Sequence, residues 1–552
     1  MRASRFLPIA VASGLLASPS ARSQAPPTFG VSAELVVIDL IATDADGRPI
    51  TDLAAHEIEL HEGSRRQRLD FVRFMTARPG AAVAIPDPIA LSAEAPAAGA
   101  ASAPVGLGLS LVVVVDLASI PFEALARTRE AVAKLLQAGF EPRARLMLVT
   151  LEHGLQVRLP FTDDVEQFTR TMNELRWGQT SDGSLDRLVD DVRTSCSAPN
   201  GRPAAIALGR AWVEGARTDM TLSLNGLAAL ARQLALLPGR KQVVLLSAGY
   251  STDPGAIAAD LVSQLCGGGL ADARVSLLAG HVEASRLVPQ LIDEANRSQV
   301  SVYTVDVRGL MSDMPPASWG GAGGAGFQAV IRRIQREGKD TLSSIADGTG
   351  ASAFVNTNDP AAAQRAAATD ARGYYLLGYA APEGREEGRF YRVTVKVARP
   401  GARLRFRRGY EWLNEEKRSE RAIAGAFLFP GLYSGDGLAV DSHVDGGRLK
   451  AAVMLPTRAL VFRSEAGGYR NALVLQGLLR DDNGRAVGDN YIFTKRVDMN
   501  LSETRYADLR SRDSVEIASD AKAPKPGRYQ LAVVLRHSGG RLASAATDVI
   551  VP

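Results

Sequence analysis

Residues 109–115 read LSLVVVV, a continuous run of apolar and mostly β-branched side chains. This composition is typical of a strand buried on both faces of a parallel sheet. Apolar residues at helical spacing follow from Phe122 to Leu136, and strand and helix patterns then keep alternating. This alternation predicts an α/β domain over 107–380 with a doubly wound, mostly parallel sheet. The further strands expected are 146–151, 242–247 and 300–307, and the helices are 165–175, 222–237, 288–298 and 328–346.

Strand patterns flank this α/β region on both sides. Residues 29–76 alternate apolar and polar positions between turn signals, which predicts a small β unit. Residues 388–412 contain two more strand patterns. We expect them to pair with 29–76 in one small β-sandwich, because two or three short strands alone are marginally stable in water. Residues 432–552 carry about seven short strand signals, which is typical of an Ig-like β-sandwich.

Three other segments differ in composition from these domains. Residues 78–106 are dominated by Ala and Pro and are expected to form a flexible linker. Residues 413–430 contain a charged helix that links the last two β regions. Residues 178–217 look like a polar, Gly-containing insertion in the α/β domain.

The N-terminus has the features of a secretory signal peptide over 1–23. Arg2 and Arg5 precede the apolar run 6–17, and small residues follow at 21 and 23, where a signal peptidase would cleave. The alternative is a short membrane anchor, although the run is shorter than the ~20 apolar residues that span a bilayer. We therefore expect an exported protein, periplasmic or extracellular, with no membrane span in the mature chain.

Length and charge narrow the possible functions. The chain has 552 residues, and single domains take about 100 to 200, so three or more domains are expected. The formal net charge of +4 falls to +1 without residues 1–23, because they carry three arginines and no acid. Nothing therefore favours a nucleic-acid partner, for which a basic patch and a recognisable fold are expected. The arginines at 403, 405, 407 and 408 follow a strand pattern and predict a solvated strand face.

Cys196 and Cys266 are the only cysteines in the chain. In an exported protein they predict a disulfide, which would close a loop of about 70 residues and stabilise the fold by roughly 4 kcal/mol. Two cysteines so far apart and six scattered histidines give no metal cluster.

Several segments, in this order, resemble the secreted VWFA-related family of the acidobacterial type, which is von Willebrand factor A (vWA)-like. The resemblance covers 29–412 and implies a vWA or Rossmann-like α/β domain with an N-terminal β segment, export, a protein partner and no enzyme activity. The segments are 35–63 (LVVIDLIATDADGRPITDLAAHEIELHEG), 112–119 (VVVVDLAS), 302–309 (VYTVDVRG), 342–358 (LSSIADGTGASAFVNTN), 373–379 (GYYLLGY) and 408–410 (RGY).

Ligands of doubly wound sheets lie beyond the carboxyl ends of the strands. In metal-binding vWA domains this edge holds Asp-x-Ser-x-Ser, a Thr and a second Asp, all hard ligands for Mg²⁺. Here Ala118 and Ile120 replace the two hydroxyls, and Ala248 stands where the second Asp is expected. We therefore expect a degenerate site with no metal and no cofactor. Asp116 would cap the following helix; the alternative is a non-standard metal site in which Asp116 is joined by Ser119, Thr218 or Asp219.

No complete catalytic motif is present. The glycines of 321–326 match G-x-G-x-x-G but do not leave a strand directly, so a loop is expected. Neither G-x-S-x-G nor a phosphate loop occurs, and a hydrolase would need Ser247 with His153 or His281.

The leading hypothesis is a protein-binding or scaffolding module, and a purely structural envelope component is a further alternative. The binding surface is expected at the carboxyl edge of the sheet, at Asp116, Ser119, Thr218, Asp219, Ser247 and Tyr250.

Overall fold

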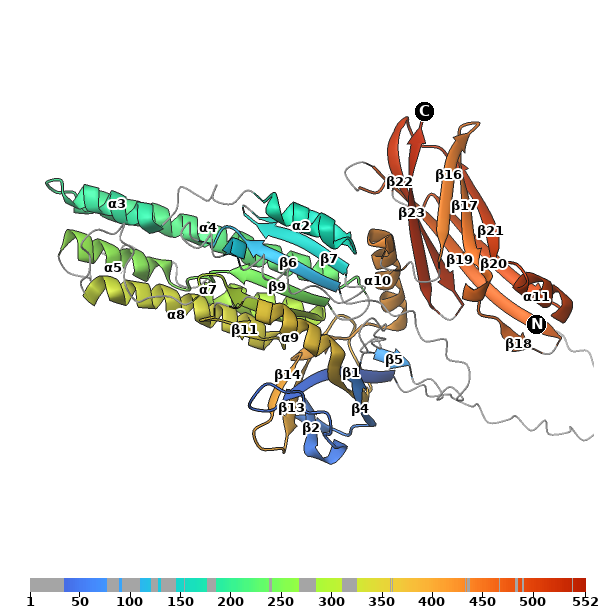
Figure 1. Ribbon diagram of the computed structural model, residues 1–552, viewed down its shortest axis with the longest axis horizontal. Helices are drawn as coiled ribbons and strands as arrows, with labels where there is room; N and C mark the ends of the chain where they lie inside the picture. Colours follow the sequence, from blue (N-terminus) through green and yellow to red (C-terminus); the bar gives the residue numbers. More distant parts are fainter. Residues whose placement is uncertain are drawn as a thin grey trace, which may run out of the picture.

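The computed structural model shows an α/β domain with an N-terminal β-sandwich below it and a C-terminal β-sandwich to one side (Figure 1). The predicted signal peptide, most of the helix expected after Phe122, His153, His281 and most of the glycine run 321–326 lie outside the described residues. The structure describes residues 34–76, 89–91, 110–120, 128–130, 145–152, 154–175, 185–237, 241–267, 284–309, 325–357, 359, 361–431, 433, 437–465, 467–481, 485–488, 491–538 and 540–552.

The central sheet is mixed, with strand order β11-β10-β9-β6-β7-β8. Its neighbours pair in parallel except β8, which runs antiparallel to β7. All residues of β6, β9 and β10 are buried, as their continuous apolar runs predict. The edge strand β8 was not predicted, because only one of its residues is buried. The strands are β6 (Ser110–Asp116), β7 (Arg145–Leu151), β8 (Leu155–Thr162), β9 (Lys241–Ser247), β10 (Val300–Asp306) and β11 (Ala353–Phe354).

Helices cover both faces of this sheet. Alternate residues of β6 point to opposite faces, so Val113 packs with α2 (Val165–Asn173) and α9 (Ala361–Arg372) on one side. Val112 packs on the other side with α4, α7 and α8. These three helices span Arg202–Leu234, Ala284–Arg297 and Ala325–Gly348. The mixed α/β architecture agrees with the vWA-like fold expected from the sequence.

A bundle of helices extends past one end of the sheet (Figure 1). It consists of α3 (Leu185–Cys196), α5 (Pro254–Cys266) and the first halves of α4 and α8, and we call it the cap. The cap has its own hydrophobic core, formed by residues such as Val189, Val213, Ile257, Val330 and Ile331.

The described part of the expected polar insertion, residues 185–217, is therefore largely helical. The sequence analysis assigned it no secondary structure because it weighed polar composition, whereas Leu188, Val189 and Val192 are spaced to give α3 one apolar face.

The N-terminal sandwich joins segments far apart in the chain. The described part of the expected β unit 29–76, from residue 34, pairs with 388–412 as predicted, through β1 with β14 and β2 with β13. One sheet contains β14 (Arg403–Phe406), β1 (Glu34–Thr43), β12 (Gly373–Ala380) and β4 (Phe71–Thr76), with β5 (Ile89–Leu91) also paired to β1. The other contains β15 (Gly409–Glu411), β13 (Phe390–Val397), β2 (Ile58–Glu62) and β3 (Arg65–Gln67), and the short helix η1 (Ala55–Glu57) precedes β2.

Three expectations about this region need correction. Strand β12 was assigned to the α/β domain 107–380 but lies in the sandwich, because Tyr375, Leu377 and Tyr379 fill its core. Part of the linker 78–106 forms β5. Two arginines of the expected solvated face are paired instead: Arg405 with the buried Asp370 of α9, and Arg407 with the buried Asp39.

The helix α10 (Glu415–Leu428) lies between the α/β domain and the C-terminal sandwich (Figure 1). Its Ala426 and Phe427 share one hydrophobic core with Val112 of β6 and Val534 of the sandwich. Among the described helices, none is long and apolar enough to cross a membrane.

Two sheets form the C-terminal sandwich around one apolar core. The first contains β16 (Ala439–Asp445), β17 (Arg448–Pro456) and β21 (Ser514–Lys522). The second contains β18 (Arg463–Glu465), β19 (Gly468–Asp481), β20 (Phe493–Leu501), β22 (Gly527–His537) and β23 (Leu542–Val551). Two short helices, η5 (Thr457–Ala459) and α11 (Glu503–Arg510), lie between strands along the chain.

Candidate functional site

A network of hydroxyl groups surrounds Asp116 at the carboxyl edge of the central sheet. Asp116 ends β6 and Ser247 ends the neighbouring parallel strand β9, so the two side chains meet at this edge. The Ser247 hydroxyl donates to Asp116 Oδ2 at 2.8 Å. The Ser119 hydroxyl lies 2.9 Å from that of Ser247 and accepts a hydrogen bond from the backbone N–H of Ala248 at 3.1 Å. Three of the predicted site residues are thus brought together.

The helix α4 contributes Ser223, which the sequence analysis missed. Its hydroxyl is 3.4 Å from Asp116 Oδ1. The expected donor Thr218 instead lies on the exposed side of α4 and bonds its own helix at the carbonyl of Glu214, and the structure does not bring Asp219 to Asp116 by any contact that it describes. A usable signal was present, because Ser223 is a polar residue on the apolar helix face of Met220, Leu224 and Leu227.

Three of the six residues of the predicted binding surface are buried. Asp116 and Ser247 are fully buried, and Tyr250 is only 5 % exposed. The reason is the cap: α4, α5 and α8 continue beyond the ends of the strands and cover this edge. A partner therefore cannot reach Tyr250, which the sequence analysis placed on the binding surface.

Burial also sets the protonation behaviour of the network. Loss of solvent raises the pKa of Asp116, and the polar Tyr250, Ser247 and Ser119 side chains around the carboxylate oppose the rise. Burial and the nearby Asp116 charge raise the pKa of Tyr250 well above its usual value. The buried Tyr250 hydroxyl forms no hydrogen bond with the residues that the structure describes.

A second carboxylate at this edge, that of Asp306, is paired with an arginine. Asp306 ends β10, and the side chain of Arg308 contacts both of its oxygens at 2.9 Å, through Nε and a terminal nitrogen. The Asp306 and Arg308 side chains are 0 % and 5 % exposed. A bidentate pair of this kind leaves Asp306 committed to Arg308, two residues further along the chain.

These donors do not fit a tightly bound divalent cation. Asp116 is the only carboxylate in the network, and its oxygens are already bonded to serine hydroxyls. Mg²⁺ needs near-octahedral oxygen coordination, yet Ala118, Ile120 and Ala248 supply carbon. No group of three or more His, Cys, Asp or Glu side chains is placed to hold a metal within the described residues.

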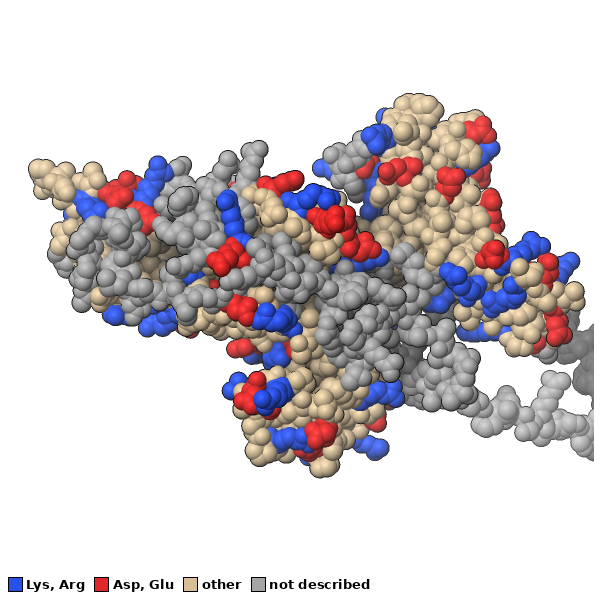
Figure 2. Space-filling model, in the orientation of Figure 1, with Lys and Arg blue, Asp and Glu red and all other residues tan. Residues whose placement is uncertain are grey.

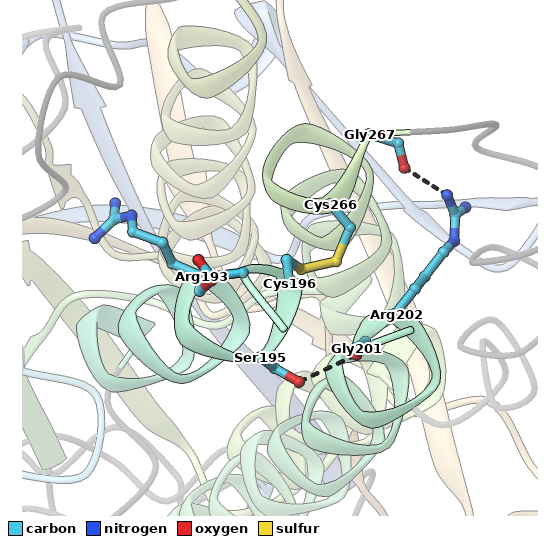
Figure 3. The surroundings of a disulfide bond; sticks show 8 residues. Arg193, Ser195, Cys196, Gly201, Arg202, Cys266 and Gly267 are labelled. Atoms are coloured by element: carbon cyan, nitrogen blue, oxygen red, sulfur yellow. Dashed lines mark hydrogen bonds between the residues drawn. A yellow bond between two sulfur atoms is a disulfide. The ribbon is translucent and has the colours of Figure 1, made fainter. Parts of the chain in front are cut away.

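The predicted disulfide between Cys196 and Cys266 is present, with a Cα–Cα distance of 4.9 Å. It joins the last residue of α3 to the last residue of α5, at the end of the cap (Figure 3). Arg202 at the start of α4 donates to the carbonyl of Gly267 beside it. The ends of three cap helices are therefore held together at one point.

No family model and no curated protein matches the chain. Solved structures match with low identity. An aerotolerance-related membrane protein from Bacteroides fragilis is 12% identical over 48% of this chain and 98% of its own, with a TM-score of 0.20. The conserved hypothetical protein BatB from Bacteroides thetaiotaomicron is 11% identical over 48% and 97%, with a TM-score of 0.22. A von Willebrand factor type A protein from Catenulispora acidiphila is 9% identical over 95% and 75%, with a TM-score of 0.21. The mixed six-stranded sheet of this chain agrees with a vWA-like module.

Proposed function

We propose that this chain is an exported, non-catalytic protein that binds or scaffolds another protein through a vWA-like domain with a degenerate metal site. One observation carries the proposal: Asp116 is fully buried beneath the cap, and its carboxylate is bonded to Ser223 and Ser247. A metal-dependent adhesion domain needs an ion that a carboxylate of the partner can reach. The covered edge offers no such access.

Recognition would then use the outer surfaces of the domains. Protein interfaces of this kind rely on buried apolar or aromatic anchors inside a polar rim, without a shared ion. The cap suits this role because its own hydrophobic core and the Cys196–Cys266 disulfide give it a fixed shape. A rigid surface loses less entropy on binding than a mobile loop does.

The disulfide also supports export. Disulfides persist in the periplasm and outside the cell, whereas reducing systems keep cytosolic thiols free. The only two cysteines of the chain form this bond. The proposed location is therefore the periplasm or the cell exterior.

The test is cross-linking of the tagged full-length chain in the native envelope, with and without a chelator. We expect the same protein partner to be recovered in both conditions and with Asp116→Asn. Loss of the partner on chelation would instead establish a metal-dependent adhesion module. If no partner is recovered and the purified chain is also inert in cross-linking, the binding proposal fails.

A further inference from the structure

Arginines from four strands project from one face of the C-terminal sandwich. Arg463 of β18 lies directly opposite Arg470 of β19. Arg496 of β20 and Arg536 of β22 lie on either side of Val474 in β19. Residues opposite each other in antiparallel strands share a face, and alternate residues along β19 do too, so all four arginines point the same way. We call Arg463, Arg470, Arg496 and Arg536 the arginine face.

This face is the outer side of the sheet, and its floor is small and apolar. Leu473 and Leu475 point the other way and are fully buried in the sandwich core. Between the arginines lie Ala472 and Val474, which are half-buried. The side chains of Arg470 and Arg496 are 63% and 72% exposed, so their guanidinium groups are accessible to a ligand.

Positive charge on this face exceeds the negative charge beside it. Glu465 is 3.1 Å from Arg470, and Asp498 is 3.0 Å from Arg496. Arg463 and Arg536 form no ion pair with any residue that the structure describes. Figure 2 shows Lys and Arg side chains gathered over the part of the sandwich formed by β18, β19 and β20. Like charges directly opposite each other destabilise a strand pair. The position of Arg463 opposite Arg470 therefore lowers the stability of the fold and is not explained by a role in folding.

The arginine face adjoins the interface between the C-terminal sandwich and the helix α10. Further along the same side of the sheet, Ala532 and Val534 are buried against Ala426 and Phe427 of α10. One end of the face is thus covered by α10 and the α/β domain, and the other end is open. A ligand seated on the open end would lie beside the junction of the two domains.

We infer that the arginine face binds an acidic segment of the partner protein. The inference rests on the proposed function and specifies the chemistry of the partner. Planar guanidinium groups pair carboxylates through two hydrogen bonds, and the floor at Ala472 and Val474 accepts apolar side chains. A continuous polyanion fits less well, because its charged backbone would lie over the apolar floor at Ala472 and Val474, where a peptide can place apolar side chains.

The test uses the full-length chain and a short fluorescent peptide that alternates glutamate with leucine. Fluorescence anisotropy is expected to show binding that Arg463→Glu/Arg470→Glu weakens at least about tenfold. The control Arg458→Glu/Arg505→Glu makes the same charge change at two exposed arginines outside the face and should leave the affinity unchanged. Equal weakening by the control, or equal binding of a glutamine-for-glutamate peptide, overturns the inference.

Thermal stability gives an independent readout. Arg463→Glu places opposite charges across the β18–β19 pair, so it should raise Tm while it weakens peptide binding. A lower Tm together with lost binding would make the arginines structural and overturn the inference. Tighter binding of an oligonucleotide or a sulfated polysaccharide than of the peptide, at equal charge, would also overturn it.

The same variant separates this inference from the proposed function. If the wild-type chain captures a protein partner in the envelope and Arg463→Glu/Arg470→Glu captures it equally well, the inference fails and the proposed function stands. If the wild-type chain captures no partner and still binds the acidic peptide, the proposed function fails by itself.

Discussion

A β carbon on Gly249 would lie only 2.3 Å from the carbonyl oxygen of Gly338. Gly249 follows β9 with a φ of +79°, a conformation that favours glycine, and Gly338 lies inside α8. A β carbon on Gly338 would in turn lie 2.6 Å from the carbonyl oxygen of Ala248. The two glycines allow α8 to cross the carboxyl edge of the sheet directly beside Ser247. This backbone contact helps to close the edge above Asp116.

Gly249→Ala should destabilise the α/β domain by about 2 kcal/mol, because the added methyl group forces α8 outward and the φ is strained. Urea unfolding followed by tryptophan fluorescence measures the change. The control is Gly215→Ala in α4, where nothing lies within 4 Å of the new atom and the φ is not positive. That change should stabilise the helix by up to about 1 kcal/mol. Equal stabilities of the two variants would disprove the role of the close contact.

Asp116→Asn should change how stability depends on pH. Burial raises the pKa of Asp116, so the folded protein holds this proton at pH values where the unfolded chain has released it. Stability is then greatest at acid pH and falls as pH rises from the unfolded pKa through the raised folded pKa. Asparagine does not titrate, so the variant should be more stable than wild type at neutral pH and equal to it at low pH.

Urea titrations at a series of pH values test this prediction for Asp116. The matched control is Asp359→Asn, because Asp359 is exposed and pairs with the exposed Arg365. Its effect should stay below about 1 kcal/mol at any pH. A loss of stability in Asp116→Asn at neutral pH would show that the ionised carboxylate is compensated in a way that the described contacts do not include.

Removal of the disulfide should loosen the cap and leave the sandwiches intact. Cys196→Ser/Cys266→Ser opens a loop with a sequence separation of 70, which costs about 4 kcal/mol on the chain-entropy model. Hydrogen exchange should rise in α3 and α5, whose ends the bond joins. Reduction of the wild-type protein should reproduce the pattern. Unchanged exchange in both helices would mean that the cap core holds them without the bond.

Asp370→Ala should weaken the attachment of the N-terminal sandwich to the α/β domain. Asp370 of α9 accepts a hydrogen bond from the Tyr303 hydroxyl at 2.6 Å and another from Arg405 of β14 at 2.9 Å. Removing the carboxylate leaves both partners without their acceptor and should cost about 3 kcal/mol. Limited proteolysis at the domain junction measures the effect. Stability equal to that of wild type would show that apolar contacts alone hold the domains together.

Calorimetry with Mg²⁺, Mn²⁺ and Ca²⁺ should detect no site tighter than about 1 mM. The physical reason is the donor set, because Asp116 is one buried carboxylate and carbon replaces oxygen at Ala118, Ile120 and Ala248. Binding of a protein partner should also survive chelation. A micromolar dissociation constant that disappears in Asp116→Ala would reveal a metal site rebuilt from other residues.

The sequence by itself determined the class of the central fold and the disulfide. The apolar runs of β6, β9 and β10 predict from composition alone that these strands are buried. The reason is that a strand covered on both faces has no polar side. The pairing of Cys196 with Cys266 followed from their number. These features depend on local pattern or on counting, so no knowledge of packing was needed.

Only the tertiary structure decided what covers Asp116 and which residues reach it. The choice of Ser223 over Thr218 depends on the phase of α4 against the sheet, and each residue turns the helix by about 100°. Burial of Asp116 and Tyr250 depends on helices from three separate segments that extend past the strands. Arg405 and Arg407 likewise show a strand pattern in the sequence, yet their partners Asp370 and Asp39 come from distant parts of the chain. Such contacts are set by non-local packing, which a local pattern does not encode.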